Sequence, residues 1–581
     1  MPRNYRRKVL AVPDSADESK SAPLQTVAKE TLSSIRIQNQ CFAGERLSFR
    51  DINDDIVRQD SVVSRSALRK ATRNPHCPVT LKPPVSPPIT DQNAPEYDAP
   101  IATSKDPVYI TTHPFPISVA TFPGKGRGLV SETSIPQGRL IFEETAPTAV
   151  VTNAHLGDRC SYCGREKGLQ QPLSRCKSCK KLHYCSRSCQ LKDWPDHRSE
   201  CAILASHSQV LPASVRLFHR LLRRPEHFTQ ACQAIDAMEG ILEQLPLSKV
   251  SEAGQTVTIT RQLLQEISLP SGRDLLHRYI KLTTHSFGWA DSSLVAFGLT
   301  FLPNISLLNH HCNPNCAVLF EHRRAKLRTL RNISPGEELT ISYIDTTLPT
   351  SWRQETLQDT YFFKCRCTLC SSPDLEMETL KTLFKCQNPS CSGSLSIPLD
   401  ISELAELENV VSPNCPQCGN PVLPSTAEAW RAANQTLSQY RAASVTPSQT
   451  EARWVLETIQ QTVCTTHHLA VEASQLCLAV GLTSPTCKSP DYQWLYHIAS
   501  TLASTLHQIL PGHSPLHSVY DYTVAKLLFL IRPSSLTAAD SLFIRDTLRS
   551  LSITHGVNSD FYKSLSDSMS HLQLEKRYQA V

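Results

Sequence analysis

Eight residues of metal-binding types are crowded between residues 160 and 201. They form four pairs with two or three intervening residues, namely Cys160 and Cys163, Cys176 and Cys179, Cys185 and Cys189, and His197 and Cys201. Zinc takes four thiolate or imidazole ligands, and two ligands this close in sequence can bind one ion from a single turn of chain. A disulfide cluster would need an oxidising compartment, and the N-terminus does not resemble a signal peptide. The spacing therefore predicts two zinc sites.

Two further groups of cysteines have metal-ligand spacing. Cys365, Cys367 and Cys370 supply three thiolates, one short of a closed zinc site. Cys386 and Cys391 form a pair, and Cys415 and Cys418 form another that is flanked by Pro416 and Gly419, as in a zinc-ribbon knuckle. The alternative for these last four residues is two unrelated pairs of reduced cysteines. So many cysteines in metal-type spacing favour a reducing compartment, the nucleus or the cytoplasm.

Chemistry other than metal binding is indicated by a glycine loop and two polar stretches. The loop is Gly124-Lys125-Gly126-Arg127-Gly128, and it follows an alternating, strand-like segment. Its glycines permit backbone conformations closed to other residues, but its spacing is not that of a dinucleotide fingerprint, so by itself it also fits a hairpin turn. The polar stretches are Ser-Leu-Leu-Asn-His-His-Cys-Asn-Pro-Asn-Cys at 306–316 and Pro-Gly-Glu-Glu-Leu-Thr-Ile-Ser-Tyr-Ile-Asp at 335–345, followed by Phe363 and the three cysteines.

Taken together and in this order, these motifs resemble those of SET-domain lysine methyltransferases of the SET-and-MYND family. The resemblance implies a multidomain α+β fold, in which a MYND zinc finger splits a β-rich SET domain. It also implies a post-SET zinc site and an all-α, tetratricopeptide-like C-terminal domain. A small zinc-ribbon-like module is predicted between them from the cysteine pairs.

The resemblance implies an S-adenosylmethionine-dependent protein-lysine N-methyltransferase. Methyl transfer is an in-line displacement by a neutral lysine amine, so the protein must mainly position and desolvate the reactants. A lysine amine is an ammonium at neutral pH, and an apolar, aromatic channel favours its neutral form. Tyr343 matches the family's catalytic tyrosine, whose hydroxyl orients the amine and the methyl group. The alternative for Tyr343 is a tyrosine in the core of a strand.

Other site residues are carried over from the same resemblance. It implies a cofactor site made of Lys125, Gly126, Arg127, Asn309, His310, Tyr343 and Phe363. It also implies that Cys312 is the fourth ligand of the post-SET ion. Glu337 and Glu338 are expected to be structural or surface residues. Two residues depart from the family pattern: His311 stands where serine is usual, and His285 replaces a common asparagine.

The finger's ligand pairing is also implied by the family and not by the spacing. Its cross-braced pattern assigns one ion to Cys160, Cys163, Cys185 and Cys189, and the other to Cys176, Cys179, His197 and Cys201. Such fingers can bind proline-containing peptides. With the post-SET site and the ribbon, the expected total is three zinc sites and a fourth.

The remaining sequence predicts how these sites are carried. Alternation predicts strands near 117–121, 129–130 and 140–142, and apolar residues at helical spacing dominate 202–285 and the chain after 427. The predicted division is a disordered arm at 1–110, the first part of SET at 114–158, the finger at 160–201, a helical insert at 202–290, the SET core at 291–345, the post-SET segment at 346–371, the ribbon-like module at 380–425 and a helical domain at 427–581.

Composition narrows the partners. The net charge of +6 over 581 residues is small, so direct nucleic-acid binding is not expected. The richest apolar run, at 524–531, is short and contains Lys526, so it predicts a buried helix and no membrane span. The expected partner is a protein with a target lysine. The alternative function is a catalytically weak or inactive adaptor that binds peptides of partner proteins.

Overall fold

We analysed a computed structural model of the chain. The described residues are 102–104, 114–168, 172–206, 210–223, 242, 245–263, 271–396, 414–420, 432, 434–440, 447–483, 491–532 and 535–579. Of the predicted disordered arm, only residues 102–104 are among them, and these residues form a strand. That strand, β1 (Ala102–Ser104), pairs with β2 (Ile117–Phe122). Three small residues carry too short a pattern to reveal a strand.

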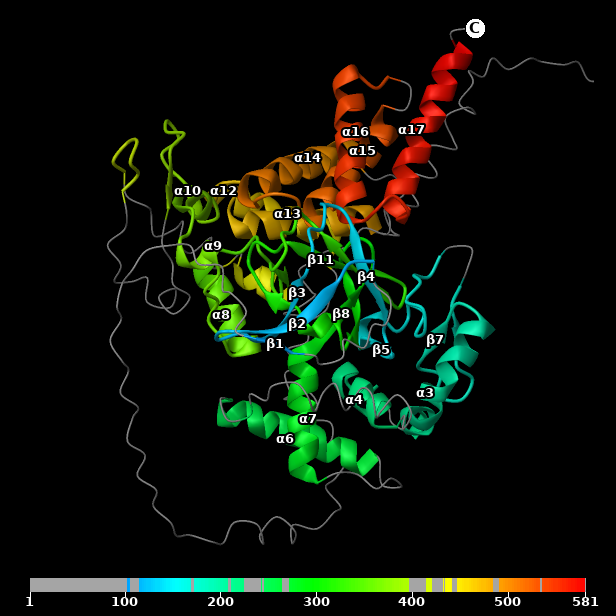
Figure 1. The fold of residues 1–581 in the computed structure, drawn as a ribbon. Coiled ribbons are helices and arrows are strands. Elements are labelled where there is room, and N and C mark those ends of the chain that lie inside the picture. Colours follow the sequence, from blue (N-terminus) through cyan, green and yellow to red (C-terminus); the bar gives the residue numbers. More distant parts are fainter. Residues whose placement is uncertain are drawn as a thin grey trace, which may run out of the picture.

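Three sheets, paired mostly antiparallel, build the centre of the molecule (Figure 1). In the first, β2 pairs with β3 (Gly126–Ser131), as the alternation predicted. In the second, β4 (Leu140–Thr145) pairs with β12 (Arg324–Thr329), which pairs with β11 (Cys316–Glu321). The third contains β5 (Thr148–Val151), β9 (Ala296–Phe301) and β8 (Ser286–Ala290). All three combine strands from before and after residues 152–285, so a long insertion interrupts one β-rich domain.

One parallel pair of strands completes the first sheet. The short strand β10 (Asn309–His310) runs beside β13 (Glu338–Ile341), with Asn309 opposite Thr340 and His310 opposite Ile341. On its other side β13 pairs with β3, directly after the glycine loop. This order brings the loop, the Asn309 segment and the strand leading to Tyr343 to one place.

The insertion has two parts. The finger contains the hairpin β6 (Ser174–Arg175) and β7 (His183–Tyr184), followed by the helix α3 (Arg187–Ser206). The helices α4 (Ala213–Arg223), α6 (Leu247–Leu263) and α7 (Gly272–His285) follow, as the helical spacing predicted. Nine of the eleven residues of α4 are buried, including the eight consecutive residues 215–222 with Arg216, His219 and Arg220. Burial around the whole helix shows that polar groups of α4 take part in the packing.

The C-terminal part is helical, as predicted, and lies over one side of the sheets (Figure 1). Its elements are α12 (Gln449–Thr462), α13 (His468–Thr483), α14 (Tyr492–Ile509), α15 (Pro515–Ile531), α16 (Ala538–Thr554) and α17 (Asp560–Gln579). Neighbouring helices in this order pack against one another. The predicted buried helix at 524–531 is the second half of α15, whose Leu516 to Leu530 are all buried. The tetratricopeptide-like arrangement stays a prediction.

Short helices and one hairpin connect the SET core to this domain. They are α8 (Thr350–Tyr361), α9 (Thr368–Ser371), α10 (Leu375–Leu380), and the strands β14 (Leu383–Lys385) and β15 (Ser394–Ser396). Among the described residues, no helix combines the length and apolar character needed to cross a membrane.

Candidate active site and metal centres

Tyr343 lies in an aromatic cluster just after β13. Its ring centroid is 4.9 Å from that of Tyr361, 5.4 Å from that of His310 and 6.5 Å from that of Phe363. Its hydroxyl donates a hydrogen bond to the carbonyl of Leu308 at 2.6 Å. Burial, and then the neighbouring Tyr361, raise the pKa of Tyr343 above its ordinary value. Tyr343 therefore stays protonated at neutral pH and acts as a hydrogen-bond donor that cannot serve as a base.

His310 connects the tyrosine strand to the post-SET cysteines. The backbone N–H of Tyr343 donates to His310 Nδ1 at 3.0 Å, so the ring proton of neutral His310 resides on Nε2. Nε2 lies 3.3 Å from Cys312 Sγ. Burial lowers the pKa of His310 to about 3, which keeps the ring neutral. One face of the site is thereby tied to the thiol of Cys312, a predicted metal ligand, through a ring in a defined tautomer.

The glycine loop meets Asn309 through close backbone contact. A Cβ on Gly128 would lie 2.7 Å from Asn309 Nδ2 and 2.8 Å from the ring of Phe122, so only glycine fits there. Asn309 Nδ2 donates to the carbonyl of Arg127 at 3.2 Å and to Glu338 Oε1 at 2.8 Å. Gly126 has a φ of +75°, a conformation that suits glycine.

The contacts of Glu338 with the predicted cofactor residues could not be foreseen from the sequence. Glu338 was expected to be structural or on the surface, but its side chain is 11% exposed and joins two predicted cofactor residues. Oε1 accepts from Asn309, and Oε2 accepts from Lys125 Nζ at 2.9 Å. Nothing in the sequence pairs Glu338 with Lys125, because 213 residues separate them. Glu337, by contrast, accepts from Asn315 Nδ2 and the Ser334 N–H and fixes the turn before β13.

This arrangement fits a methyl donor with an amino-acid end and an adenine ring. Lys125 and Arg127 offer positive charge to a carboxylate, and Glu338 with Asn309 offers acceptors to an ammonium group. The aromatic rings of His310, Tyr343 and Phe363 provide an apolar wall beside them. The backbone packing at Gly128 keeps these groups close together.

The two departures from the family pattern both lie near the loop. His311 Nδ1 accepts from the N–H of Asn313 at 2.9 Å, and burial lowers its pKa. His285 ends α7, where its Nδ1 lies 2.8 Å from the carbonyl of Lys281. Burial lowers the pKa of His285 as well, and the charge of Arg127 lowers it further. Both histidines are held neutral, so neither adds a positive charge beside the loop.

The segment that follows Tyr343 is fixed by buried charges. Arg353 is fully buried and its Nη1 donates to Glu378 Oε1 at 3.0 Å and to the carbonyl of Leu348 at 2.7 Å. Lys381, also buried, donates to Glu378 Oε1 and to the carbonyl of Thr346, each at 3.2 Å. These contacts join residues 346–350 to the connection with the helical domain.

The structure brings the sixteen predicted metal ligands together in four groups. In each group the ligand atoms all lie within 4.8 Å of one another. The finger groups are those of the cross-braced pattern, with Cys163 and Cys185 sulfurs 3.6 Å apart in one and Cys176 and Cys201 sulfurs 3.8 Å apart in the other. Cys312 joins Cys365, Cys367 and Cys370, and its sulfur lies 3.5 Å from that of Cys370. The last group contains Cys386, Cys391, Cys415 and Cys418.

These donor sets suit zinc. All the cysteines in them are free thiols. A tetrahedral ion with metal–sulfur bonds of about 2.3 Å separates its sulfur ligands by roughly 3.8 Å, whereas a disulfide would hold them at about 2.0 Å. The sulfur–sulfur distances match the tetrahedral value.

Among the described residues, the other cysteines and histidines take no part in these groups. Cys477 donates to the carbonyl of Ala452, and His467 accepts from the N–H of Leu469 and stacks on His468. Cys487 lies outside the described residues.

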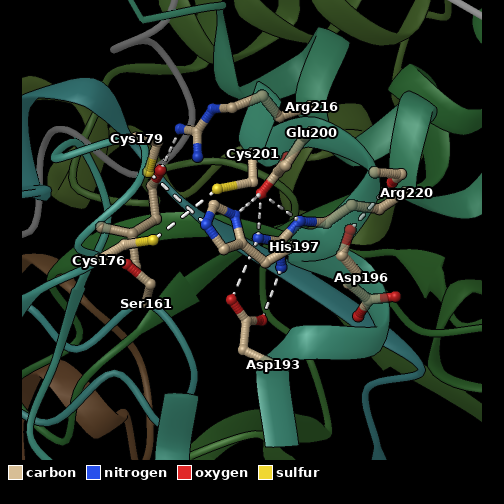
Figure 2. Close-up of polar contacts among 12 residues, drawn as sticks. Ser161, Cys176, Cys179, Asp193, Asp196, His197, Glu200, Cys201, Arg216 and Arg220 are labelled. Atoms are coloured by element: carbon tan, nitrogen blue, oxygen red, sulfur yellow. Dashed lines mark hydrogen bonds and ion pairs between the residues drawn. The ribbon is translucent and has the colours of Figure 1, made fainter. Parts of the chain in front are cut away.

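A buried charge network joins the second finger site to the SET insert (Figure 2). His197 Nδ1 lies 3.3 Å from Glu200 Oε1, and Glu200 also accepts from Arg220 of α4. Arg220 Nη1 donates to Asp193 Oδ1 at 2.9 Å and to the carbonyl of Ala149 in β5 at 3.2 Å. Arg220, Asp193 and Glu200 are each at most 1% exposed. His197, a predicted metal ligand, is thus oriented by a carboxylate that the insert itself neutralises.

The chain was compared with known proteins. The SET domain family matches residues 126–344. Histone-lysine N-methyltransferase ASHR1 of Arabidopsis thaliana is 24% identical over 493 residues, which cover 80% of this chain and 97% of that protein. N-lysine methyltransferase SMYD2 of Gallus gallus is 33% identical over 267 residues, covering 45% of this chain and 61% of the relative. Histone-lysine N-methyltransferase SMYD3 of Homo sapiens is 34% identical over 269 residues, covering 44% and 61%. The chain therefore spans nearly all of ASHR1 but about three fifths of SMYD2 and SMYD3.

Proposed function

We propose that the chain is an S-adenosylmethionine-dependent protein-lysine N-methyltransferase of the SET and MYND type, supported by its match to the SET domain family and its similarity to ASHR1, SMYD2 and SMYD3. The single observation that carries the proposal is the parallel pairing of β10 with β13. It sets Asn309 and His310 beside the strand that leads to Tyr343, and so joins a polar cofactor cradle to an aromatic cluster.

S-adenosylmethionine, when bound, supplies an electrophilic methyl group on a sulfonium. In this proposal Lys125, Gly126 and Arg127 hold its carboxylate side, and Asn309 with Glu338 holds its ammonium group. His310 and Phe363 pack beside the adenine. The proposal follows from the charges, the close packing at Gly128 and the aromatic contacts described above.

Tyr343 is the proposed catalytic residue. Its hydroxyl is protonated and points to the carbonyl of Leu308. Two oxygens at this position can orient a lysine amine that has lost its proton to solvent, because both the carbonyl and the hydroxyl oxygen accept N–H hydrogen bonds. The surrounding rings of Tyr361 and Phe363 disfavour the charged ammonium by desolvation.

We also propose that zinc occupies the two finger sites and the post-SET site. The substrate is a protein with an accessible lysine. The finger is a candidate for binding proline-containing peptides, and the many free thiols in metal-type groups favour the nucleus or cytoplasm as the location.

The proposal is tested by methyl transfer into a cell extract. Purified protein is incubated with S-adenosylmethionine carrying a labelled methyl group, next to its Tyr343→Phe variant. We expect label in discrete protein bands for the wild type and at least a roughly 100-fold loss in the variant, the scale of misplacing a reacting group. Equal labelling by both proteins would refute the role of Tyr343. A wild type that binds no S-adenosylmethionine would favour the peptide-binding adaptor.

A further inference from the structure

The fourth group of cysteines lies outside the SET domain and the finger. We call it the ribbon cluster, and its members are Cys386, Cys391, Cys415 and Cys418. The first two follow strand β14 and precede β15, and the last two belong to a turn at residues 414–420. Methyl transfer as proposed above makes no use of this cluster.

The sulfurs of the ribbon cluster are arranged as zinc ligands are. Cys386 Sγ lies 3.5 Å from Cys418 Sγ, and Cys391 Sγ lies 3.9 Å from Cys415 Sγ. These values bracket the roughly 3.8 Å edge of a tetrahedron with zinc–sulfur bonds of about 2.3 Å. Backbone N–H groups point at two sulfurs, from Asn388 to Cys386 and from Gly393 to Cys391. Donors directed at sulfur stabilise thiolates, the form that binds metal.

The two halves of the cluster are packed closely. A Cβ on Gly393 would lie 2.9 Å from Cys415 Sγ and 2.9 Å from Gln417 Oε1, so the hairpin loop touches the turn where only glycine fits. The turn closes on itself through Cys415 N–H to the carbonyl of Asn420 and Gly419 N–H to the carbonyl of Cys415.

The hairpin that carries the cluster is also anchored to the helical domain. Phe384 and Leu395 are 3% and 5% exposed and belong to the core of that domain. Phe384 forms a bridge with Val463, and the N–H of Cys464 donates to the carbonyl of Leu383 at 3.0 Å. The strands of this hairpin have three residues each, and a hairpin this short is only marginally stable in water by itself. The β14–β15 hairpin therefore needs further stabilisation.

We propose that the ribbon cluster binds a fourth zinc ion, which staples the β14–β15 hairpin and thereby fixes the junction between the post-SET segment and the helical domain. Four thiolates favour a thiophilic, tetrahedral ion. The ion closes the loop between the strands and adds the turn at 414–420, as metal binding does in other small modules that lack a core. Lys381 extends the same connection to the carbonyl of Thr346, three residues after Tyr343.

The first test is the metal content of the full-length protein. Inductively coupled plasma mass spectrometry should find four zinc ions per chain in the wild type and three in the Cys415→Ser, Cys418→Ser double variant. Two controls should keep four: Ser390→Ala, an exposed residue of the same loop, and Cys464→Ser, a cysteine outside every cluster. Three ions in both the wild type and the double variant would overturn the site, and iron as the fourth ion would overturn its assignment to zinc.

The second test addresses whether the ion stabilises the β14–β15 hairpin. Amide hydrogen exchange of residues 383–396 should become faster in the double variant, while that of the finger stays unchanged. One zinc fewer with unchanged exchange over 383–396 would overturn the staple role. If the double variant is insoluble, Gly393→Ala keeps all four thiols and should lose the fourth zinc at a lower chelator concentration than the wild type. Equal resistance to chelator would contradict the proposal. Neither readout depends on methyl transfer, so failure here leaves the proposed activity untouched.

Discussion

Replacing Arg220 with methionine should weaken the junction between the finger and the SET insert. Methionine retains much of the side-chain volume but removes the charge that Asp193 and Glu200 share. Both carboxylates are at most 1% exposed, so each would be left buried without its cation. Breaking a buried ion pair by removing one partner costs about 3–5 kcal/mol.

Arg216 provides a matched control one turn away on α4. It is equally buried and its charge also lowers the pKa of Glu200, but less than the charge of Arg220 does, and its hydrogen bonds to the carbonyls of Leu211 and Val151 and to Asn153 Oδ1 go to neutral acceptors. Leaving neutral acceptors unpaired costs about 1–3 kcal/mol, so Arg216→Met should be the milder change.

The pH dependence of the Arg220 effect has a defined sign. Burial alone would raise the pKa of Glu200, but the charge and hydrogen bonds of Arg220, together with the contact to His197 and the charge of Arg216, outweigh burial and hold the pKa below its ordinary value. In the wild type this carboxylate therefore stabilises the fold above pH 4.5, and the contribution is lost as pH falls through the lowered pKa. Without Arg220, burial raises the pKa, and protonation relieves the unpaired charge. The difference between variant and wild type should be greatest near pH 7 and shrink toward pH 5.

Zinc release during a urea titration reports this junction. Because the chain has several domains, the midpoints of this one transition are compared and no global free energy is derived. Arg220→Met should release finger zinc at a clearly lower urea concentration than Arg216→Met, with the gap narrowing at pH 5. Equal midpoints for the two variants, or a gap that widens in acid, would refute the reasoning.

Three further predictions concern the site and the domain junction. Cys312→Ser should remove one zinc and also weaken S-adenosylmethionine binding, because His310 joins this thiol to Tyr343. The expected loss of affinity is about 5- to 150-fold, the usual range of coupling between sites. Calorimetry that shows zinc loss with unchanged affinity would contradict this prediction. Glu338→Gln should raise KM for S-adenosylmethionine by roughly 10- to 100-fold with a smaller change in kcat, since Asn309 loses the charged acceptor of its hydrogen bond. Steady-state kinetics with an unchanged KM would exclude Glu338 from the site. The Nε2 atom of His555 lies 3.2 Å from the carbonyl of Ser292, and burial lowers the pKa of this histidine to about 4. Neutral His555 therefore stabilises the fold above pH 6.5, and this contribution is lost as pH falls. The loss in the free energy of unfolding is about 2 kcal/mol at pH 5. His555→Gln should therefore show a smaller fall in unfolding temperature between pH 7 and pH 5 than the wild type, and an equal fall would argue against this assignment.

Local patterns in the sequence predicted much of this molecule. Metal-ligand spacing found fifteen of the sixteen clustered residues, because ligands separated by a few residues define part of a site by themselves. Cys312 and the division of the finger ligands between two groups came from the family resemblance. Alternation located β2, β3 and β4, and helical spacing located the insert and the C-terminal domain. The assignment of site residues required the family resemblance, since nothing local in the sequence links Tyr343 to a methyl donor.

Contacts between distant segments escaped the sequence reading. Glu338 reads as a polar residue at the start of a strand, and only the pairing of β13 with β3 and β10 brings it to Lys125 and Asn309. Arg220 is a charged residue in the middle of a helix, but the carboxylates of Asp193 and Glu200 on α3 allow it to be buried. Both cases depend on partners that no periodicity encodes.

The identity of the methylated atom tests the central proposal most directly. Protein bands labelled from S-adenosylmethionine by the wild type are hydrolysed, and the labelled amino acid is identified by chromatography. The site described here predicts that the label is in Nε-methylated lysine and that it disappears with Tyr343→Phe. Label in another amino acid, or in lysine regardless of Tyr343, would contradict a lysine methyltransferase whose amine is oriented by this hydroxyl.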